Sequence, residues 1–457
     1  MKTTKKIGNN ICLAVAFAAI AGCVALSPAF GDNGSQVKAV GLLLGALLLW
    51  ISKALPMSIT TLLLIFLLPL MGLMEYQAVL SNFGIGTALF IMASSGIAVA
   101  IINSTIPYKI TEKIFAGKGK HPIVLIFCFG LAVTVFSGFV SSLATCTLFT
   151  TLAAAALQNM KLSKEKSNFA KVVMLSIPVC SGIGGFISPA GTPANLLVLE
   201  WMNNNGLNMT FAKWCAIGFP VCILSAVVFL TFAVLLYKPE NLNFEGSFEV
   251  KKLSGHDYFV LTVVCVVMLG WFLSSFVAAI NITLVAIVGL VLLMLPSFEV
   301  LTFKDFSEGV NWDLVLTMGS VSVLMTAIAN TGIVTKVATA VMNVLPVSDL
   351  FVLLFGLSIV ICAIRAFVPT TTAVIALLLP MLVDISALSK INCGVLLLIA
   401  AFWAATALLL IFTEPIFLIS YKEGYFKQKD LLKVGIPTNV VLAAICPLLI
   451  YAIFSCW

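Results

Sequence analysis

Runs of about 20 apolar residues recur from one end of this 457-residue chain to the other, and no other feature restricts its fold so strongly. A helix of that length crosses the ~30 Å hydrocarbon core of a bilayer, where only helices and closed barrels satisfy their own backbone hydrogen bonds. Composition agrees, because 61% of the residues are hydrophobic and only 9% are charged. A soluble domain carries about 25% charged residues. The sequence therefore predicts an all-α polytopic membrane protein.

The apolar runs predict eleven transmembrane helices, at residues 10–28, 37–53, 57–75, 85–105, 168–204, 213–237, 257–277, 280–297, 312–332, 391–422 and 435–456. Two further apolar stretches, 122–158 and 349–387, are interrupted midway by Ser and Thr. Each interruption favours a re-entrant hairpin, which enters and leaves the membrane on one side. Irregular backbone persists at membrane depth only when it is packed in protein or lines a wet cavity.

The distribution of basic residues supports this topology. With the N-terminus in the cytoplasm, only Lys38, Lys213, Lys336 and Lys390 of the 25 basic residues fall outside, and Arg365 alone lies at membrane depth. Membrane proteins concentrate Lys and Arg in cytoplasmic loops, and a full span in place of either hairpin would reverse every later loop. We therefore predict a multi-pass protein of the cytoplasmic (inner) membrane with its N-terminus inside and its C-terminus outside.

The N-terminal region allows a second interpretation. Lysines precede an apolar stretch, and residues 20–23 resemble a lipoprotein cleavage box. We favour an uncleaved first span over a signal sequence within residues 1–31, because many later spans follow.

The two halves of the chain repeat. Trp50 corresponds to Trp271, residues 102–105 match 329–332, and Gly206 matches Gly424, all at an offset of about 220 residues. The pattern predicts a first span within 1–37, one repeat at 38–237, a cytoplasmic linker at 238–256 and a second repeat at 257–457. Each repeat holds five spans and one hairpin, and this odd number of spans inverts the second copy, as in secondary transporters.

Four segments interrupt the apolar pattern at membrane depth: 137–145 and 191–195 in the first repeat, and 369–372 and 413–415 in the second. Hydroxyls and freed carbonyls can replace the hydration shell of a small cation, and half-helix N-termini attract anions. Alternatively, the Ser and Thr side chains only bond back to helical carbonyls or join helices. Because the four segments are paired by the repeat, we favour a binding site.

The chain resembles the divalent anion:sodium symporter family (DASS, solute carrier 13), within the ion transporter superfamily. The resemblance rests on Leu49 to Pro56, on Gly191-Thr192-Pro193-Ala194-Asn195, on residues 370–380 and on the lead into the last span at 424–435. It implies uptake or exchange of a dicarboxylate, a tricarboxylate or sulfate, driven by sodium. It also implies a homodimer with scaffold and transport subdomains that work as an elevator.

The four interrupted segments, the resemblance and the charged residues at membrane depth together indicate two sets of site residues. Substrate contacts are expected from Ser142, Thr145, Thr192, Pro193, Thr370, Thr371, Thr372, Thr413 and Arg365. Cation contacts are expected from Ser137, Ser141, Ser142, Gly191 and Glu414, with a sodium ion held at Ser137, Ser141 and Gly191. The chain departs from the family where both hairpin tips carry Ser-Asn-Thr, since it has Ser141-Ser142-Leu143 and Thr370-Thr371-Thr372.

Arg365 and Glu414 are the ionisable residues nearest these segments at depth. A lone buried charge is costly, so each is expected to be paired or to face water. One hypothesis is a structural ion pair that replaces a lost cation. The other is that Arg365 contacts an anionic substrate while Glu414 binds a coupling proton or cation.

Other classes of protein fit less well. A second branch of the same superfamily, with proton coupling or exchange of another anion, remains an alternative. An intramembrane enzyme is disfavoured because the chain has no Gly-rich phosphate loop, HExxH motif or paired intramembrane aspartates. The 12 cysteines lie singly and the two histidines flank basic loops, so no cofactor is predicted beyond a coupling sodium. The expected partners are a small anion, lipid and a second copy of the chain, with no nucleic acid.

Overall fold

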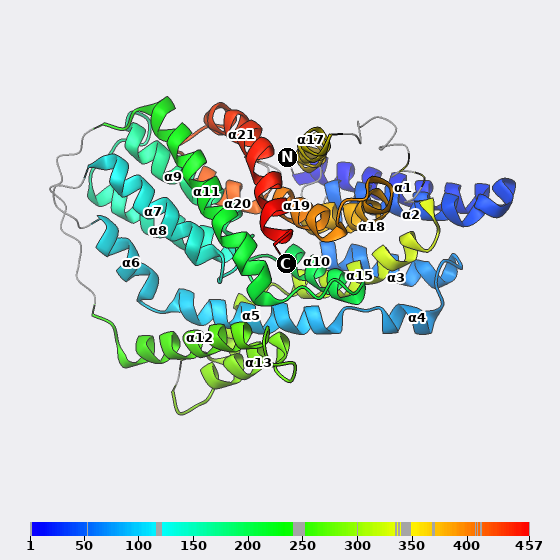
Figure 1. Cartoon of the computed structure of the whole chain (residues 1–457), viewed down its shortest axis with the longest axis horizontal. Coiled ribbons are helices and arrows are strands. Elements are labelled where there is room, and N and C mark those ends of the chain that lie inside the picture. The colour runs from blue at the N-terminus through cyan, green and yellow to red at the C-terminus, as the bar shows by residue number, and fades with distance from the viewer. Residues whose placement is uncertain are drawn as a thin grey trace. The chain divides into compact units, whose positions relative to one another are not determined.

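The computed structural model describes residues 2–52, 54–115, 121–240, 252–298, 300–333, 336, 339, 349–367, 371–406, 408, 410, 411 and 414–456. Within these residues every regular element is a helix (Figure 1). The all-α prediction is therefore confirmed for the described part of the chain.

The first half contains α1 (Lys2–Leu26), the 3-10 segment η1 (Ser27–Asn33), α2 (Gly34–Ser52), α3 (Met57–Leu70), α4 (Tyr76–Ser81), α5 (Ile85–Asn103), α6 (Ile106–Phe115), α7 (Pro122–Ser137), α8 (Ser142–Asn159), α9 (Asn168–Gly184), α10 (Pro193–Asn204) and α11 (Phe211–Tyr237). The second half contains α12 (Gly255–Leu273), α13 (Ile282–Leu293), α14 (Phe303–Gly309), α15 (Trp312–Ala329), α17 (Leu350–Phe367), α18 (Thr371–Ser389), α19 (Cys393–Thr406), α20 (Pro415–Tyr421) and α21 (Gln428–Phe454).

By length and composition, six described helical segments can cross a membrane: Asn10–Trp50, Tyr76–Asn103, Phe211–Tyr237, Gly255–Leu273, Trp312–Ala329 and Gln428–Phe454. Several other apolar helices are shorter, because glycine, proline or a hydroxyl-rich segment ends them early. The predicted spans 168–204 and 391–422 each consist of two helices, and Pro193 and Pro415 begin the second of each pair. Proline suits this first position, where its missing N–H has no helical partner. The number of eleven spans stays a prediction.

Both predicted hairpins contain two helices separated at the hydroxyl-rich interruption. In the first, α7 ends at Ser137 and α8 begins at Ser142. In the second, α17 and α18 flank residues 368–370, which lie outside the described residues. The first interruption thus lies within the predicted segment 137–145. The second hairpin, and the side of the membrane on which each hairpin opens, stay predictions.

Three short helices, α4, α6 and α14, were not expected from the sequence. They are too short or too polar to meet a hydropathy criterion for a span. The ten-residue α6 is amphipathic, since Pro107, Thr111, Glu112 and Phe115 are buried while Lys113 is exposed.

The chain forms two compact units, each drawn from both predicted repeats. Unit 1 comprises Met1–Ala88 and Asn311–Ala400, and unit 2 comprises Leu89–Val310 and Ala401–Trp457. In unit 1, α15 packs against α3 and α18, and α1 packs against α2. In unit 2, α9 packs against α7, α8, α11 and α20 (Figure 1). The division into inverted repeats, and into scaffold and transport subdomains, stays a prediction.

Helix α9 is the centre of unit 2. Residues 172–189 are all buried, as expected for a helix that is apolar on every side. Its serines are satisfied locally, because Ser176 donates a hydrogen bond to the Val173 carbonyl and Ser181 donates to the Pro178 carbonyl. The buried end of α9 leads directly into the irregular segment that precedes α10.

The start of α9 is held by a carboxylate that lies just beyond the C-terminal end of α11. Glu240 accepts hydrogen bonds from the Ser167 hydroxyl and from the Phe169 backbone N–H, the latter at 3.0 Å. Burial by itself would raise the pKa of Glu240. The hydrogen bonds from Ser167, Phe169 and Asn168 outweigh it and hold the pKa below its ordinary value of 4.5. Glu240 therefore caps α9 as a carboxylate.

We expect Glu240→Gln to lower the melting temperature of the protein, because the amide cannot accept all of these bonds. A charge-assisted cap of this kind contributes about 1–2 kcal/mol. A carboxyl with a depressed native pKa stabilises fully above its unfolded pKa, and this contribution is lost as the pH falls through the native pKa. The melting difference between Glu240→Gln and the wild type should thus be constant above the ordinary value of 4.5 and shrink below it. The exposed neighbour Glu165→Gln serves as the control, and a difference that grew in acid would contradict the assignment.

Candidate substrate and cation site

The turn between α7 and α8 is built around close backbone contacts. The C-cap of α7 is Gly138, where a Cβ atom would lie 2.7 Å from the Cβ of Ile187. Ser188 donates to the Gly138 carbonyl at 2.5 Å. Glycine is required because the segment after α9 passes directly over the turn, leaving no room for a side chain. The turn of the first hairpin is therefore joined to the break between α9 and α10.

Two serine hydroxyls meet at this junction. Ser137 Oγ donates to the Ser181 carbonyl at 2.6 Å and lies 3.2 Å from Ser142 Oγ. Ser142 Oγ and its backbone N–H both donate to the Gly191 carbonyl at 3.3 Å. We call Ser137, Ser142 and the carbonyls of Ser181 and Gly191 the hydroxyl cluster. Both serine side chains are buried, and each directs its hydrogen at a carbonyl, so their lone pairs remain available.

Gly185 allows the segment between α9 and α10, residues 185–192, to pack directly against this cluster. A Cβ atom at Gly185 would lie 2.3 Å from Ser142 Oγ and 2.6 Å from Thr192 Cγ2, and one at Gly191 would lie 2.4 Å from the Gly185 carbonyl oxygen. The two glycines therefore allow backbone, Ser142 and Thr192 to approach one another within van der Waals distance.

Two buried oxygens beside the cluster have no hydrogen-bond partner among the described residues, namely Thr192 Oγ1 and Asn195 Oδ1. Asn195 is fully buried, and its Nδ2 donates to the carbonyls of Gly185 (2.7 Å) and Ser188 (2.8 Å). These two bonds attach the Asn195 amide to the segment between α9 and α10. An unpaired buried oxygen is costly, so both atoms indicate a place where a bound species supplies the missing partner.

Two helix N-termini flank the cluster, since α8 begins at Ser142 and α10 at Pro193. The N-caps, Ser141 and Thr192, make no side-chain cap hydrogen bond. Neutral oxygens suit a small hard cation, while helix N-termini favour an anion. This arrangement can therefore hold a cation and an anion next to each other.

A row of polar side chains continues along α8 at helical spacing. Cys146 Sγ donates to the Ile416 carbonyl at 3.2 Å, and the hydroxyls of Thr150 and Ser420 are 2.6 Å apart. These bonds attach α20 to the second arm of the hairpin. Glu414, the N-cap of α20, is partly buried and interacts electrostatically with Cys146.

Of the predicted residues in unit 2, the structure brings Ser137, Ser142, Gly191 and Thr192 together. Ser141 is the N-cap of α8 and makes none of the bonds of the cluster; Ser142, one residue later, makes them. Thr145 is fully buried and donates to the Val140 carbonyl at 3.2 Å, so its hydroxyl closes the turn. Pro193 begins α10.

The remaining predicted residues belong elsewhere. Arg365 is 2% exposed and lies in the last turn of α17. Thr371, which is partly buried, and Thr372, which is buried, lie in the first turn of α18. All three residues belong to unit 1. Thr370 and Thr413 lie outside the described residues. One central site formed by both hairpins therefore stays a prediction.

Sequence reasoning assigned no role to Asn195, Gly185 or Ser181. Asn195 belongs to the Gly-Thr-Pro-Ala-Asn motif, so a buried amide two residues after a helix-starting proline was an available signal. Gly185 and Ser181 act through a backbone position and a carbonyl, for which the sequence carries no marker.

Comparisons with known proteins agree with this architecture. A family model described as a citrate transporter matches residues 47–376 and, separately, 276–456. An uncharacterized transporter of Haemophilus influenzae is 25% identical over 413 residues, which cover 87% of each chain. The sodium-dependent dicarboxylate transporter SdcS of Staphylococcus aureus is 21% identical over 432 residues, covering 88% of this chain and 83% of SdcS. The crystal structure of the YdaH transporter of Alcanivorax borkumensis aligns with a TM-score of 0.58 over 82% of this chain and 87% of that one, at 12% identity, which shows a shared fold.

The apolar helices, the broken segments and these relatives define a multi-pass membrane transporter rather than an enzyme. The family model covers most of the sequence, and the chain belongs to the citrate transporter family. The predicted relation to dianion transporters is thereby confirmed.

Proposed function

We propose that this protein is a secondary active transporter of a dianionic substrate, coupled to sodium by symport or working by anion exchange. The substrate class is a di- or tricarboxylate, such as succinate, malate or citrate, or sulfate. One observation carries the proposal: a buried hydroxyl cluster lies beside two buried oxygens with no described partner. The printed name of SdcS, a sodium-dependent dicarboxylate transporter, supports the same assignment.

The chemistry of the cluster favours sodium over a divalent metal. Its oxygens come from serine hydroxyls and backbone carbonyls, which carry no formal charge. Divalent cations are held by carboxylates or by nitrogen and sulfur ligands, and no cluster of three or more His, Cys, Asp or Glu residues occurs in the described part of the chain. Ser137, Ser142 and Gly191 are the proposed sodium ligands, and the Asn195 amide oxygen is a further one.

The anion would bind next to this ion, between the helix N-termini at Ser142 and Pro193. Thr192 Oγ1, which has no described partner, would donate a hydrogen bond to it. We propose Arg365, Thr371 and Thr372 of the second hairpin as further contacts of the substrate. A buried guanidinium suits a carboxylate or sulfate because it donates two parallel hydrogen bonds.

A second candidate is a proton-coupled or exchange carrier of another anion. The observation that favours it is Glu414, a carboxylate that α20 places near Cys146 on the hairpin. We further propose a homodimer in the inner membrane, with a cytoplasmic N-terminus and an elevator movement of the site.

The test is uptake into proteoliposomes of labelled succinate, citrate and sulfate, each with an inward sodium gradient, an inward proton gradient, internal counter-anion or none of these. We expect one of the anions to accumulate under the sodium gradient. Stimulation by protons alone would select the second candidate, and the absence of uptake of all three under every condition would reject both.

A further inference from the structure

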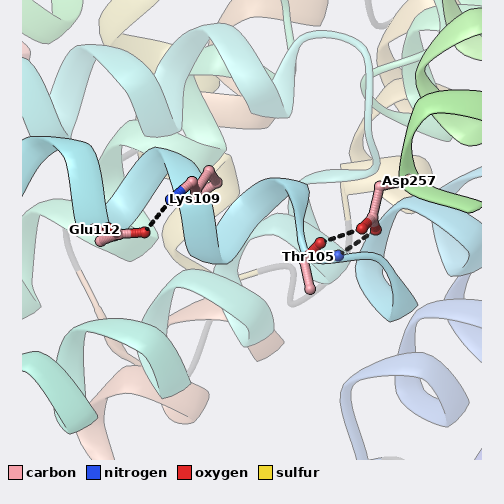
Figure 2. A network of polar contacts seen from close by, with 4 residues as sticks. All are labelled: Thr105, Lys109, Glu112 and Asp257. Atoms are coloured by element: carbon pink, nitrogen blue, oxygen red, sulfur yellow. Dashed lines mark hydrogen bonds and ion pairs between the residues drawn. The ribbon is translucent and has the colours of Figure 1, made fainter. Parts of the chain in front are cut away.

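Two segments of unit 2 that lie 152 residues apart in the sequence meet at one buried carboxylate. Asp257, in the first turn of α12, is 4% exposed. It accepts hydrogen bonds from the backbone N–H of Thr105 (2.7 Å) and from the Thr105 hydroxyl (Figure 2). It also accepts from the N–H (2.7 Å) and hydroxyl (2.8 Å) of Ser254, the N-cap of its own helix.

Thr105 belongs to the two-residue joint between α5 and α6. The other residue of the joint, Ser104, donates to the Ile101 carbonyl at 2.6 Å and accepts from the Ile106 N–H at 3.3 Å. Side chains therefore satisfy the backbone groups that the change of helix direction frees. Asp257 adds a negative charge where both α6 and α12 begin, which their partial positive ends stabilise.

Helix α6 connects this joint to the hairpin that carries the hydroxyl cluster. It packs against both α7 and α8, and the ring of Phe115 lies 5.1 Å from that of Phe129 in α7. The ion pair of Lys109 with the buried Glu112, 2.8 Å long, joins neighbouring turns of α6 (Figure 2). Helix α6 therefore links the joint to the hairpin through direct packing contacts.

We infer that Asp257 is a positioning residue for transport. It sets the angle at which α6 leaves α5, and through α6 it sets the position of the first hairpin relative to α12. This inference rests on the proposed function, because the position of the hairpin matters to a carrier that must present its site to both sides of the membrane.

A matched control for Asp257 exists in α14. Asp305 accepts from the N–H and hydroxyl of Thr302, at 3.2 and 2.5 Å, in the same capping arrangement. Asp305 reaches only three residues along its own chain and its surroundings are exposed, whereas Asp257 joins two distant segments. Asp305→Asn therefore reports the loss of an aspartate cap that makes no contact with a distant segment.

The experiment compares Asp257→Asn with Asp305→Asn, and Thr105→Val with Thr105→Ser. Two native cysteines, Cys128 on α7 and Cys265 on α12, are exposed. They can carry spin labels once the other accessible cysteines, Cys12, Cys23, Cys393 and Cys456, are replaced. Pulsed electron paramagnetic resonance then measures the distance between the labels on α7 and α12. Uptake of labelled succinate is measured per amount of folded protein.

We expect Asp257→Asn and Thr105→Val to shift or broaden the α7–α12 distance distribution. We expect them to lower uptake per folded protein by about tenfold, the effect of one lost charge-assisted hydrogen bond. Thr105→Ser, which keeps the hydroxyl, and Asp305→Asn should match the wild type. If the α7–α12 distance distribution of Asp257→Asn were the same as that of the wild type, the inference would be overturned, even if the yield of folded protein fell. The distance does not depend on the substrate, so a wild type that transports no anion would reject the proposed function and leave this test intact.

Discussion

Ser142→Ala should nearly abolish sodium-stimulated uptake while the protein still inserts and folds. The substitution removes one hydroxyl oxygen from the cluster but keeps the backbone bond from residue 142 to the Gly191 carbonyl. Loss of one oxygen ligand to an ion costs about 1.5–3 kcal/mol, or roughly 10- to 100-fold in cation affinity. Sodium titration of uptake into proteoliposomes measures this directly. The half-maximal sodium concentration should rise by that factor, and high sodium should restore part of the rate.

Ser176→Ala is the matched control for this variant. Ser176 is also fully buried, and it lies in α9, but its hydroxyl only donates back to the Val173 carbonyl at 2.7 Å. Its removal should leave the sodium dependence unchanged. If Ser142→Ala had the same sodium dependence as Ser176→Ala, the hydroxyl cluster would not be the cation site.

Gly184→Ala should prevent accumulation of folded protein. A Cβ atom at this position would lie 2.1 Å from the backbone oxygen of Thr134 in α7 and 2.8 Å from its carbonyl carbon. Neither atom can rotate away, because both belong to the main chain of a buried residue in the hairpin. Separating α7 from α9 would open the packing at the centre of unit 2, at a cost of about 3 kcal/mol or more. Thermal denaturation followed by size-exclusion chromatography measures the loss.

Gly86→Ala provides the comparison, because a Cβ atom at Gly86 meets nothing within 4 Å. In the helix α5 this change should leave stability unaltered or raise it by up to about 1 kcal/mol. Equal melting temperatures of Gly184→Ala and Gly86→Ala would show that α7 and α9 do not approach each other closely at Gly184.

Part of the site follows from sequence because helix breaks leave a local signature. Glycine, proline and clustered hydroxyls predicted interruptions at 137–145 and 191–195, and the structure has breaks between its helices at 138–141 and 185–192. The motif at 191–195 singled out Gly191 and Thr192. The assignment within the tip was less accurate. Ser141 and Ser142 are adjacent serines, and nothing in their sequence distinguishes the N-cap from the residue that contacts Gly191.

The sequence by itself determined that this chain is an all-α membrane protein with broken helices, because hydropathy and helix-breaking residues act within a few turns of the chain. Tertiary structure alone decided that Ser142, Gly185, Thr192 and Asn195 meet at one place and that Asp257 contacts Thr105. These contacts join segments that are 10 to 152 residues apart. They depend on how closely two backbones approach, which a glycine permits but does not specify. The hydroxyl-rich interruptions are thus a property of the sequence, and the binding site that they form is a property of the fold.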